Sequence, residues 1–228
     1  MLTALVIPLL LGLAVGSFLT VVTSRLGTGK TILWGRSRCP ACGETLRPFE
    51  LIPLLSFLRQ RGRCASCGAA ISRRYPLIEL STAGLFALFG LLATAGVLFV
   101  PALPPPMLPW PRFEPVIVFL YYAFFAAAAV ATAAYDIERR LIPAAIVGPL
   151  ALVGLGAAIL GAFAAGDIFV FIRTAAVAAA IFLFFWALWR FSGGRAMGRG
   201  DGDAAAAMAL YLGPAAGILG ILFAFWLG

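Results

Sequence analysis

Long apolar blocks alternate with short polar segments along the chain. Charged residues are missing from residues 1–24, 80–111, 115–135, 141–166, 174–189 and 204–228. An α-helix needs about 20 consecutive apolar residues to cross the hydrocarbon core of a bilayer. We therefore predict an all-α polytopic membrane protein with six transmembrane helices, at about 2–22, 77–100, 116–135, 141–165, 168–190 and 204–227.

Two other segments interrupt the apolar pattern. Residues 23–76 are polar and basic, and they hold all four cysteines. Residues 101–115 contain seven prolines. Because proline has no backbone N–H and disrupts helices, we expect an extended loop there. The first apolar block has no basic segment before it and no clear cleavage site, so we predict a retained span rather than a cleaved signal peptide.

Composition narrows the class of protein further. Of the 228 residues, 63% are apolar and 11% are charged, whereas roughly 25% of residues are charged in an average soluble domain. This composition excludes an ordinary soluble globular protein and a disordered chain. Histidine is absent, which excludes every mechanism that needs a histidine base or a histidine metal ligand.

The distribution of positive charge predicts the orientation in the membrane. The chain carries 17 Lys and Arg and a net charge of +8, and ten of the 17 lie between Arg25 and Arg74. Because basic loops stay on the cytoplasmic side, we expect residues 23–76 in the cytoplasm and the N-terminus outside. Alternation then places the arginine-bearing segments 136–140 and 190–203 inside as well. We interpret the charge as a topology signal and expect no nucleic-acid partner.

The four cysteines form two C-x-x-C pairs, each followed by glycine. The pairs are Cys39/Cys42 and Cys64/Cys67. This spacing is close to that of zinc ribbons, in which four thiolates bind one ion tetrahedrally. Two disulfides or four free thiols are the alternatives, and a cytoplasmic location disfavours disulfides. We predict a structural zinc ion in a small zinc-ribbon-like insert.

Most of the nine carboxylates have a simple expected role. Glu44 and Glu50 belong to the cysteine segment, and Glu114 and Asp167 are expected in solvated outer loops. Glu138 is expected to pair with the adjacent Arg139 and Arg140. Glu79 lies at the inner end of the second predicted span, where its carboxylate can reach the interface.

Asp136 and Asp201 are candidates for a catalytic pair, because both fall at the same depth, the cytoplasmic face, at the ends of predicted spans. Asp136 ends the third span, and Asp201 precedes the sixth within Gly198-Arg199-Gly200-Asp201. Two neighbouring carboxyl groups can share one proton, so that the ionised group activates water against a peptide carbonyl. Gly198 and Gly200 would let the backbone bend and let a substrate approach. The alternative is that both aspartates mark solvated helix ends.

Several motifs in order along the chain resemble those of the bacterial prepilin peptidases, also called type IV leader peptidases. Members of this family are membrane aspartic endopeptidases related to the G-x-G-D proteases. Asp136, ahead of Leu141-Ile142-Pro143, matches the first catalytic aspartate, and Asp201 matches the second. The supporting segments are Gly16–Val22 with Arg25-Leu26, Ser37–Gly43, Glu50–Phe57, Arg61–Cys64, Arg74–Leu80 and Met197–Asp201.

The resemblance implies a function and a domain plan. Such enzymes cut the basic leader from type IV prepilins and type II secretion pseudopilins at the cytoplasmic face of the inner membrane. Many members then methylate the new N-terminus with S-adenosylmethionine, for which Glu50 is a candidate contact. Residues 1–22 would be the first span, 23–76 the cytoplasmic zinc and methyltransferase domain, and 77–228 the peptidase domain.

The chain also departs from the family pattern. Ala144 stands where the family usually has an aspartate, and Asp203 stands where it usually has a lysine, so Asp203 is expected to tune the site rather than attack. The usual Pro-Phe-Gly-Pro motif is missing, and the predicted spans are fewer than in the family. These departures keep an alternative open, a catalytically weakened or inactive membrane scaffold that docks a pilus or secretion component through its zinc domain. The sequence leaves the oligomeric state undefined.

Overall fold

A computed structural model describes residues 2–101, 114–195 and 197–227. Six of its helices are long and apolar enough to cross a membrane, which confirms the predicted all-α polytopic fold. They are α1 (Leu2–Arg25), α3 (Arg74–Thr94), α4 (Glu114–Arg139), α5 (Ala144–Ala165), α6 (Ile168–Ser192) and α7 (Arg199–Leu227). Two short helices, η1 (Pro48–Glu50) and α2 (Leu55–Arg59), lie in the insert between α1 and α3.

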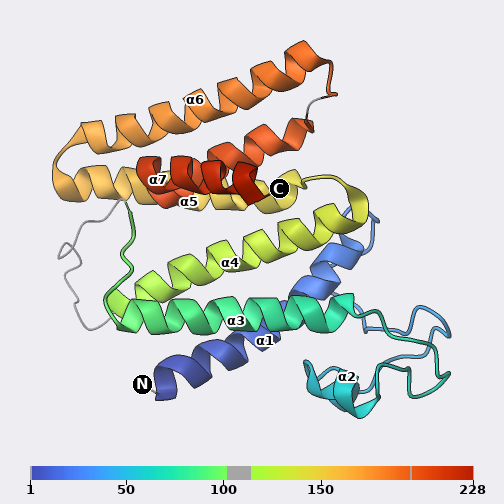
Figure 1. The fold of residues 1–228 in the computed structure, drawn as a ribbon. Helices are drawn as coiled ribbons and strands as arrows, with labels where there is room; N and C mark the ends of the chain where they lie inside the picture. Colours follow the sequence, from blue (N-terminus) through green and yellow to red (C-terminus); the bar gives the residue numbers. More distant parts are fainter. Residues whose placement is uncertain (1, 102–113, 196, 228) are drawn as a thin grey trace.

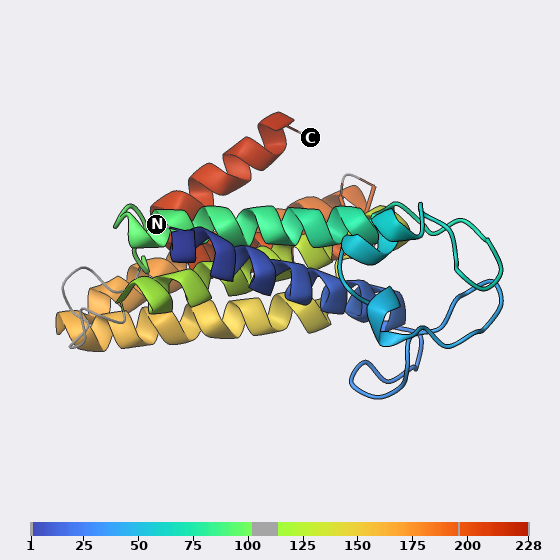
Figure 2. The same cartoon turned by 90° about the horizontal axis from the view of Figure 1, so that it is seen from below.

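The long helices form two groups of three (Figure 1). In the first group α3 packs against both α1 and α4, and in the second group α5, α6 and α7 pack against one another. Contacts between α4 and α5 join the groups. One end of the bundle, at the right in Figure 1, collects the last turns of α1, α4 and α6 and the first turns of α3, α5 and α7. The insert extends from this same end (Figure 2).

Small residues allow the closest helix contact in the first group. A Cβ atom on Gly12 would lie 2.7 Å from the Cα of Ala83, and one on Gly16 would lie 2.7 Å from the Cα of Glu79. The backbones of α1 and α3 therefore touch over two turns. Such glycine contacts are typical of helix pairs in membranes, where packing replaces the hydrophobic driving force.

Several helix ends differ from the sequence prediction, and the differences bear on the candidate site. Helix α4 continues to Arg139, so Asp136 lies inside its last turn, and α7 begins at Arg199, so Asp201 lies in its first turn. Helix α3 ends at Thr94 rather than near residue 100, because Gly96, with a φ of 69°, turns the chain. Of the predicted loop 101–115, residues 102–113 lie outside the described part. Glu114 and Pro115 belong to α4. Proline is compatible with this position, because the first turn of a helix does not need its backbone N–H.

Helix α7 is broken at Gly213. This glycine has a φ of 79° and a ψ of 170°, and Pro214 follows it. The predicted span 204–227 is thus helical, but it is divided into segments 199–212 and 214–227, each about 21 Å long at 1.5 Å per residue. A Cβ on Gly217 would lie 2.6 Å from the Cα of Ala209, so the second segment turns back against the first close to the break. Figure 2 shows the C-terminal end of this segment leaning away from the bundle.

Candidate active site and metal centre

The four cysteines of the insert come together as the sequence predicts. Their sulfur atoms all lie within 4.8 Å of one another, and all four cysteines are free thiols. Cys39 Sγ and Cys67 Sγ are 3.9 Å apart. Thiolates at about 2.3 Å from a tetrahedral ion lie roughly 3.8 Å apart, so the cluster fits one metal ion and not a disulfide, whose sulfurs lie about 2 Å apart.

Two equivalent turns build this cluster. Cys39 N–H donates to the carbonyl of Glu44 (2.9 Å), and Cys64 N–H donates to that of Ala69 (2.8 Å). Gly43 and Gly68 adopt φ values of 73° and 72°, a left-handed conformation that glycine adopts without strain.

Backbone N–H groups of Cys42 and Ala41 point toward Cys39 Sγ and lower the pKa of this thiol to about 7. Metals bind the thiolate form. The pKa of the Cys42 thiol in the same cluster is raised to about 12 against the lowering effect of the Glu44 backbone, because this thiol shares its hydrogen with the sulfurs of Cys67 and Cys39. The structure describes the whole insert. Each of its two cysteine turns carries a single isolated β-bridge and no strand, so the metal centre consists of two cysteine turns rather than a full zinc ribbon.

Asp136 is exposed in the last turn of α4, at the end of the bundle where the insert emerges. Arg74, at the start of α3, holds this turn from the side. Its Nη2 donates to the carbonyl of Ala134 (2.8 Å), and its Nη1 forms an ion pair with Glu138. The two contacts lie two residues before and two residues after Asp136, so Arg74 fixes the backbone that carries this carboxylate.

The predicted pairing of Glu138 with Arg139 and Arg140 is wrong. Glu138 binds Arg74 instead, and the guanidinium of Arg139 lies 5.0 Å from the centre of the Tyr135 ring. Adjacent residues on a helix point in different directions, so Glu138 and Arg139 do not face each other. Arg140 lies beyond the helix with a φ of 53°.

Asp201 lies in the first turn of α7 with its side chain folded back on the glycine-rich loop. Its Oδ2 accepts a hydrogen bond from the Gly198 N–H (2.8 Å). Gly200 packs against the segment that follows α4, because a Cβ there would lie 2.9 Å from the Cβ of Ile142. Gly202 packs against α6, where a Cβ would lie 3.2 Å from the Cβ of Phe185.

The structure thus brings the two aspartate motifs to one end of the bundle from different helix groups. Asp136 ends α4, Asp201 begins α7, and Gly200 contacts Ile142 in the segment between α4 and α5. Both carboxylates are accessible, Asp136 exposed and Asp201 partly buried, while Asp203 is exposed two residues further along α7.

Sequence reasoning missed the environment of Glu79. This residue is buried, with 8% of its surface exposed, rather than extended to the interface. Its carboxylate accepts hydrogen bonds from the N–H of Leu54 (2.8 Å) and from Ser17 on α1. Leu54 has a φ of 59° and a ψ of −48°, and Leu55 N–H donates to the Pro53 carbonyl, so the chain makes a strained γ-turn. Glu79 therefore ties the insert to α1 and α3.

The remaining predicted carboxylates are placed as follows. Glu50 accepts from the Arg47 N–H (2.7 Å) and lines an open cavity of about 290 Å³ in the insert, together with Phe49, Arg59 and Cys64. The guanidinium of Arg59 lies 5.3 Å from the centre of the Phe49 ring. Asp167 is the N-cap of α6 and accepts from the Phe169 N–H (2.8 Å) rather than being only solvated.

Comparison with known proteins gives matches over most of the chain. The sequence model of the bacterial peptidase A24 N-terminal domain matches residues 10–93, and that of the type IV leader peptidase family matches residues 123–228. A prepilin leader peptidase/N-methyltransferase of Dickeya chrysanthemi is 35% identical over 233 residues, which cover 90% of this chain and 73% of the relative.

Two further relatives carry the same name. The protein of Pseudomonas aeruginosa is 33% identical over 222 residues, covering 85% of this chain and 67% of the relative. The protein of Myxococcus xanthus is 57% identical over 76 residues, which make up 33% of this chain and 23% of the relative. No solved structure matches the chain.

Proposed function

Because the chain belongs to the type IV leader peptidase family, we propose that it is a membrane aspartic endopeptidase that removes the basic leader from type IV prepilins and type II secretion pseudopilins. One observation carries the assignment to particular residues. Asp136 and Asp201 lie at the same end of the bundle, and the Gly200–Ile142 contact holds their segments against each other. Residues 77–228 would then form the peptidase domain, with Gly198 and Gly200 as its supporting loop.

The positions of the two aspartates on their helices suggest different roles. A helix carries partial positive charge at its N-terminus and partial negative charge at its C-terminus. Asp201 lies in the first turn of α7 and accepts the Gly198 N–H, and both features stabilise a carboxylate. Asp136 lies in the last turn of α4, where negative charge is not favoured. We therefore propose Asp201 as the base and Asp136 as the acid of the reaction.

Peptide hydrolysis follows from these roles. The Asp201 carboxylate takes a proton from water as the water oxygen bonds to the scissile carbonyl carbon, and Asp136 gives its proton to the carbonyl oxygen. The C–N bond then breaks, and the proton held by Asp201 passes to the departing amine. The hydroxyl proton of the intermediate returns to Asp136 as the carbonyl re-forms, so both groups end as they began.

The basic segments support an orientation for this reaction. Residues 23–76 and the segments after α4 and α6 all lie at the end of the bundle that holds Asp136 and Asp201. By the positive-inside rule this end faces the cytoplasm of a bacterial inner membrane, and cleavage takes place there.

The orientation is tested by a reporter. A fusion within the insert near residue 60 is expected to give the signal of a cytoplasmic location, because residues 23–76 hold ten of the 17 basic residues of the chain. A second fusion after residue 166, between α5 and α6, is the control and is expected to report the opposite side. A periplasmic signal from the first fusion would contradict the orientation and the side of cleavage.

Zinc is the metal that we assign to the cysteine cluster. Four thiolates that can coordinate one ion tetrahedrally are typical of structural zinc sites, in which no coordination position is left for water. The sulfur atoms of Cys39, Cys42, Cys64 and Cys67 are placed to bind this ion. Its binding would stabilise an insert that has little apolar core of its own.

N-methylation of the new N-terminus is a second activity, favoured by the cavity beside Glu50. Glu50 offers this cavity a carboxylate that suits the sulfonium cation of S-adenosylmethionine, while the Phe49 ring is already covered by the Arg59 guanidinium. Residues 23–76 would then be both the zinc domain and the methyltransferase domain.

The function is tested in a bacterium that lacks its own prepilin peptidase. Expression of the chain is expected to shorten the prepilin by its leader on a gel, and the mass of the product shows whether a methyl group has been added. A product with a free amine would restrict the protein to cleavage. Uncleaved prepilin despite normal membrane insertion would support the inactive-scaffold alternative.

Arg74 offers a test of how Asp136 is held. Replacing it in Arg74→Gln removes the charged hydrogen bond to the Ala134 carbonyl, and we expect kcat to fall about tenfold with little change in KM. The ion pair with Glu138 adds little, because both side chains are partly exposed. Arg73→Gln is the matched control, since Arg73 is exposed on the neighbouring position. Equal activity of the two variants would show that Arg74 does not position the site.

A further inference from the structure

The two proposed catalytic aspartates belong to different halves of the bundle. Asp136 is carried by the group α1, α3 and α4, and Asp201 by the group α5, α6 and α7. The backbones of α4 and α7 hardly approach each other, so side chains must set the register between these two helices. We propose that Tyr121 and Tyr211 form a clasp that sets this register and so acts as a positioning device for the catalytic pair.

The geometry of the tyrosine pair is reciprocal. Tyr121 on α4 donates its hydroxyl hydrogen to the Tyr211 carbonyl, and Tyr211 on α7 donates its own to the Tyr121 carbonyl, each at 2.5 Å. The two rings are stacked with their centres 4.1 Å apart. Tyr211 is 1% exposed and is the largest of the fully buried side chains. Each tyrosine thus hydrogen-bonds to the backbone of the opposite helix, so a slip of one helix along the other would break both bonds.

The position of the clasp along α7 explains why the Tyr211 carbonyl accepts a hydrogen bond from another helix. Gly213 leaves the helical conformation and Pro214 has no N–H, so carbonyls in the preceding turn lose their usual helical partners. An unpaired carbonyl is costly within a membrane. The Tyr121 hydroxyl donates to the carbonyl of Tyr211 and so caps the C-terminal end of segment 199–212.

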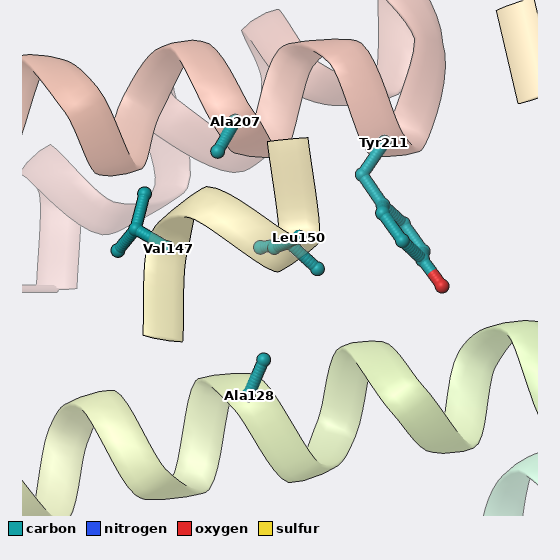
Figure 3. Close-up of a cluster of buried hydrophobic side chains, with 5 residues drawn as sticks. All are labelled: Ala128, Val147, Leu150, Ala207 and Tyr211. Carbon is teal, nitrogen blue, oxygen red and sulfur yellow. The ribbon is translucent and has the colours of Figure 1, made fainter. Parts of the chain in front are cut away.

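The apolar surroundings hold the same half-helix in place. Figure 3 shows Tyr211 with Ala207 from α7, Val147 and Leu150 from α5, and Ala128 from α4, which pack where the two groups meet. At Gly154 of α5 a Cβ would lie 2.7 Å from the Tyr211 nitrogen, so α5 supports the backbone of α7 at the clasp itself.

The other end of this half-helix carries the proposed catalytic residue. Gly200 and Gly202 fix the first turn of α7 against Ile142 and Phe185, ten residues before the clasp. Segment 199–212 is therefore a short rod that is held at both ends. Its position along α4, and with it the separation of the Asp136 and Asp201 carboxyl groups, depends on the tyrosine pair. This inference rests on the proposed peptidase function.

The test uses Tyr121→Phe, Tyr211→Phe and the double variant, as full-length protein in nanodiscs. Phenylalanine keeps the stacked ring and removes only the hydroxyl group. Tyr122→Phe is the matched control, because the Tyr122 hydroxyl donates to the Phe99 carbonyl (3.1 Å) rather than to a carbonyl of α7. We expect kcat to fall between about tenfold and 100-fold in the clasp variants, as for other small displacements of catalytic groups, and to stay within about twofold in the control.

The pH–rate profile separates positioning from mere loss of folded protein. Two carboxyl groups that share a proton give a bell-shaped profile, and the distance between its two limbs increases with their electrostatic coupling. A looser register weakens the coupling, so the limbs should move toward each other in the clasp variants. Loss of folded protein would lower the height of the bell and leave both limbs in place.

None of the other charged groups at this end of the bundle changes in these variants. On the long helices and the segments beside them these groups are Arg25 on α1, Arg73 before α3, Arg74 and Glu79 on α3, Glu138 and Arg139 on α4, Arg140 after α4, Arg190 and Arg195 at the end of α6 and beyond it, and Arg199 and Asp203 on α7; α5 carries no charged residue. A movement of the limbs therefore reports a change in the separation of the aspartates.

The outcomes distinguish the clasp from the peptidase assignment. A wild-type protein without cleavage activity would overturn the proposed function itself. A wild-type bell with limbs that stay fixed in Tyr121→Phe and Tyr211→Phe, or an equal movement in Tyr122→Phe, would overturn the clasp. If the buried Tyr211 variant fails to fold, the half-buried Tyr121 variant decides the question alone.

Discussion

Asp136→Asn and Asp201→Asn are each expected to abolish leader cleavage, with a loss of at least about 10³-fold in kcat, because neither the acid nor the base of such a pair can be replaced by an amide. Both variants should remain folded. The amide oxygen of an asparagine at position 201 can still accept the Gly198 N–H, and Asp136 is exposed. Cleavage of a purified prepilin, followed over time on a gel, measures the loss.

Asp203→Asn is the matched control for these variants. It makes the same chemical change on the same turn of α7, two residues from Asp201, at an exposed position. We expect this variant to stay active, because Asp203 is placed to tune the local charge rather than to attack. Strong cleavage by Asp201→Asn, or a loss of cleavage confined to Asp203→Asn, would show that the wrong aspartate has been assigned.

Cys64→Ser is expected to release the metal and unfold the insert. Structural zinc in comparable small domains binds with an apparent free energy of about 10–16 kcal/mol, and this energy also stabilises the fold. Losing one of four thiolates should therefore unfold most of residues 26–73, while the long helices persist in the membrane. Metal content by mass spectrometry and protease sensitivity of the insert measure the two effects.

The control for the cysteine variant is Ser66→Ala. Ser66 lies in the same turn between Cys64 and Cys67, but it is not a ligand in the proposed site. This variant is expected to keep one zinc ion per chain and a protease-resistant insert. An unchanged zinc content in Cys64→Ser would contradict a site shared by all four cysteines.

The features that sequence predicts well here are local in character. The six long helices follow from uncharged blocks of sufficient length, and the metal cluster follows from two C-x-x-C-G turns whose spacing fixes each pair. The arrival of Asp136 and Asp201 at one end of the bundle follows from the alternation of spans. Each inference needs only the chain itself and the thickness of a bilayer.

Features that depend on contacts between distant residues could not be predicted. Nothing in the local sequence pairs Glu138 with Arg74 or turns the Glu79 carboxylate toward Leu54. The tyrosine clasp joins residues 90 positions apart. Gly213-Pro214 is a visible helix-breaking signal, but the apolar block around it gave no reason to expect that the second half of α7 would fold back.

The most direct test of the aspartic peptidase assignment is the mass spectrum of a prepilin after incubation with the purified protein in nanodiscs. We predict a single cut at the boundary between the basic leader and the hydrophobic helix, made by the wild-type protein and missing with Asp136→Asn and Asp201→Asn. An intact prepilin after incubation with the wild-type protein, or the same cut made by either variant, would contradict it.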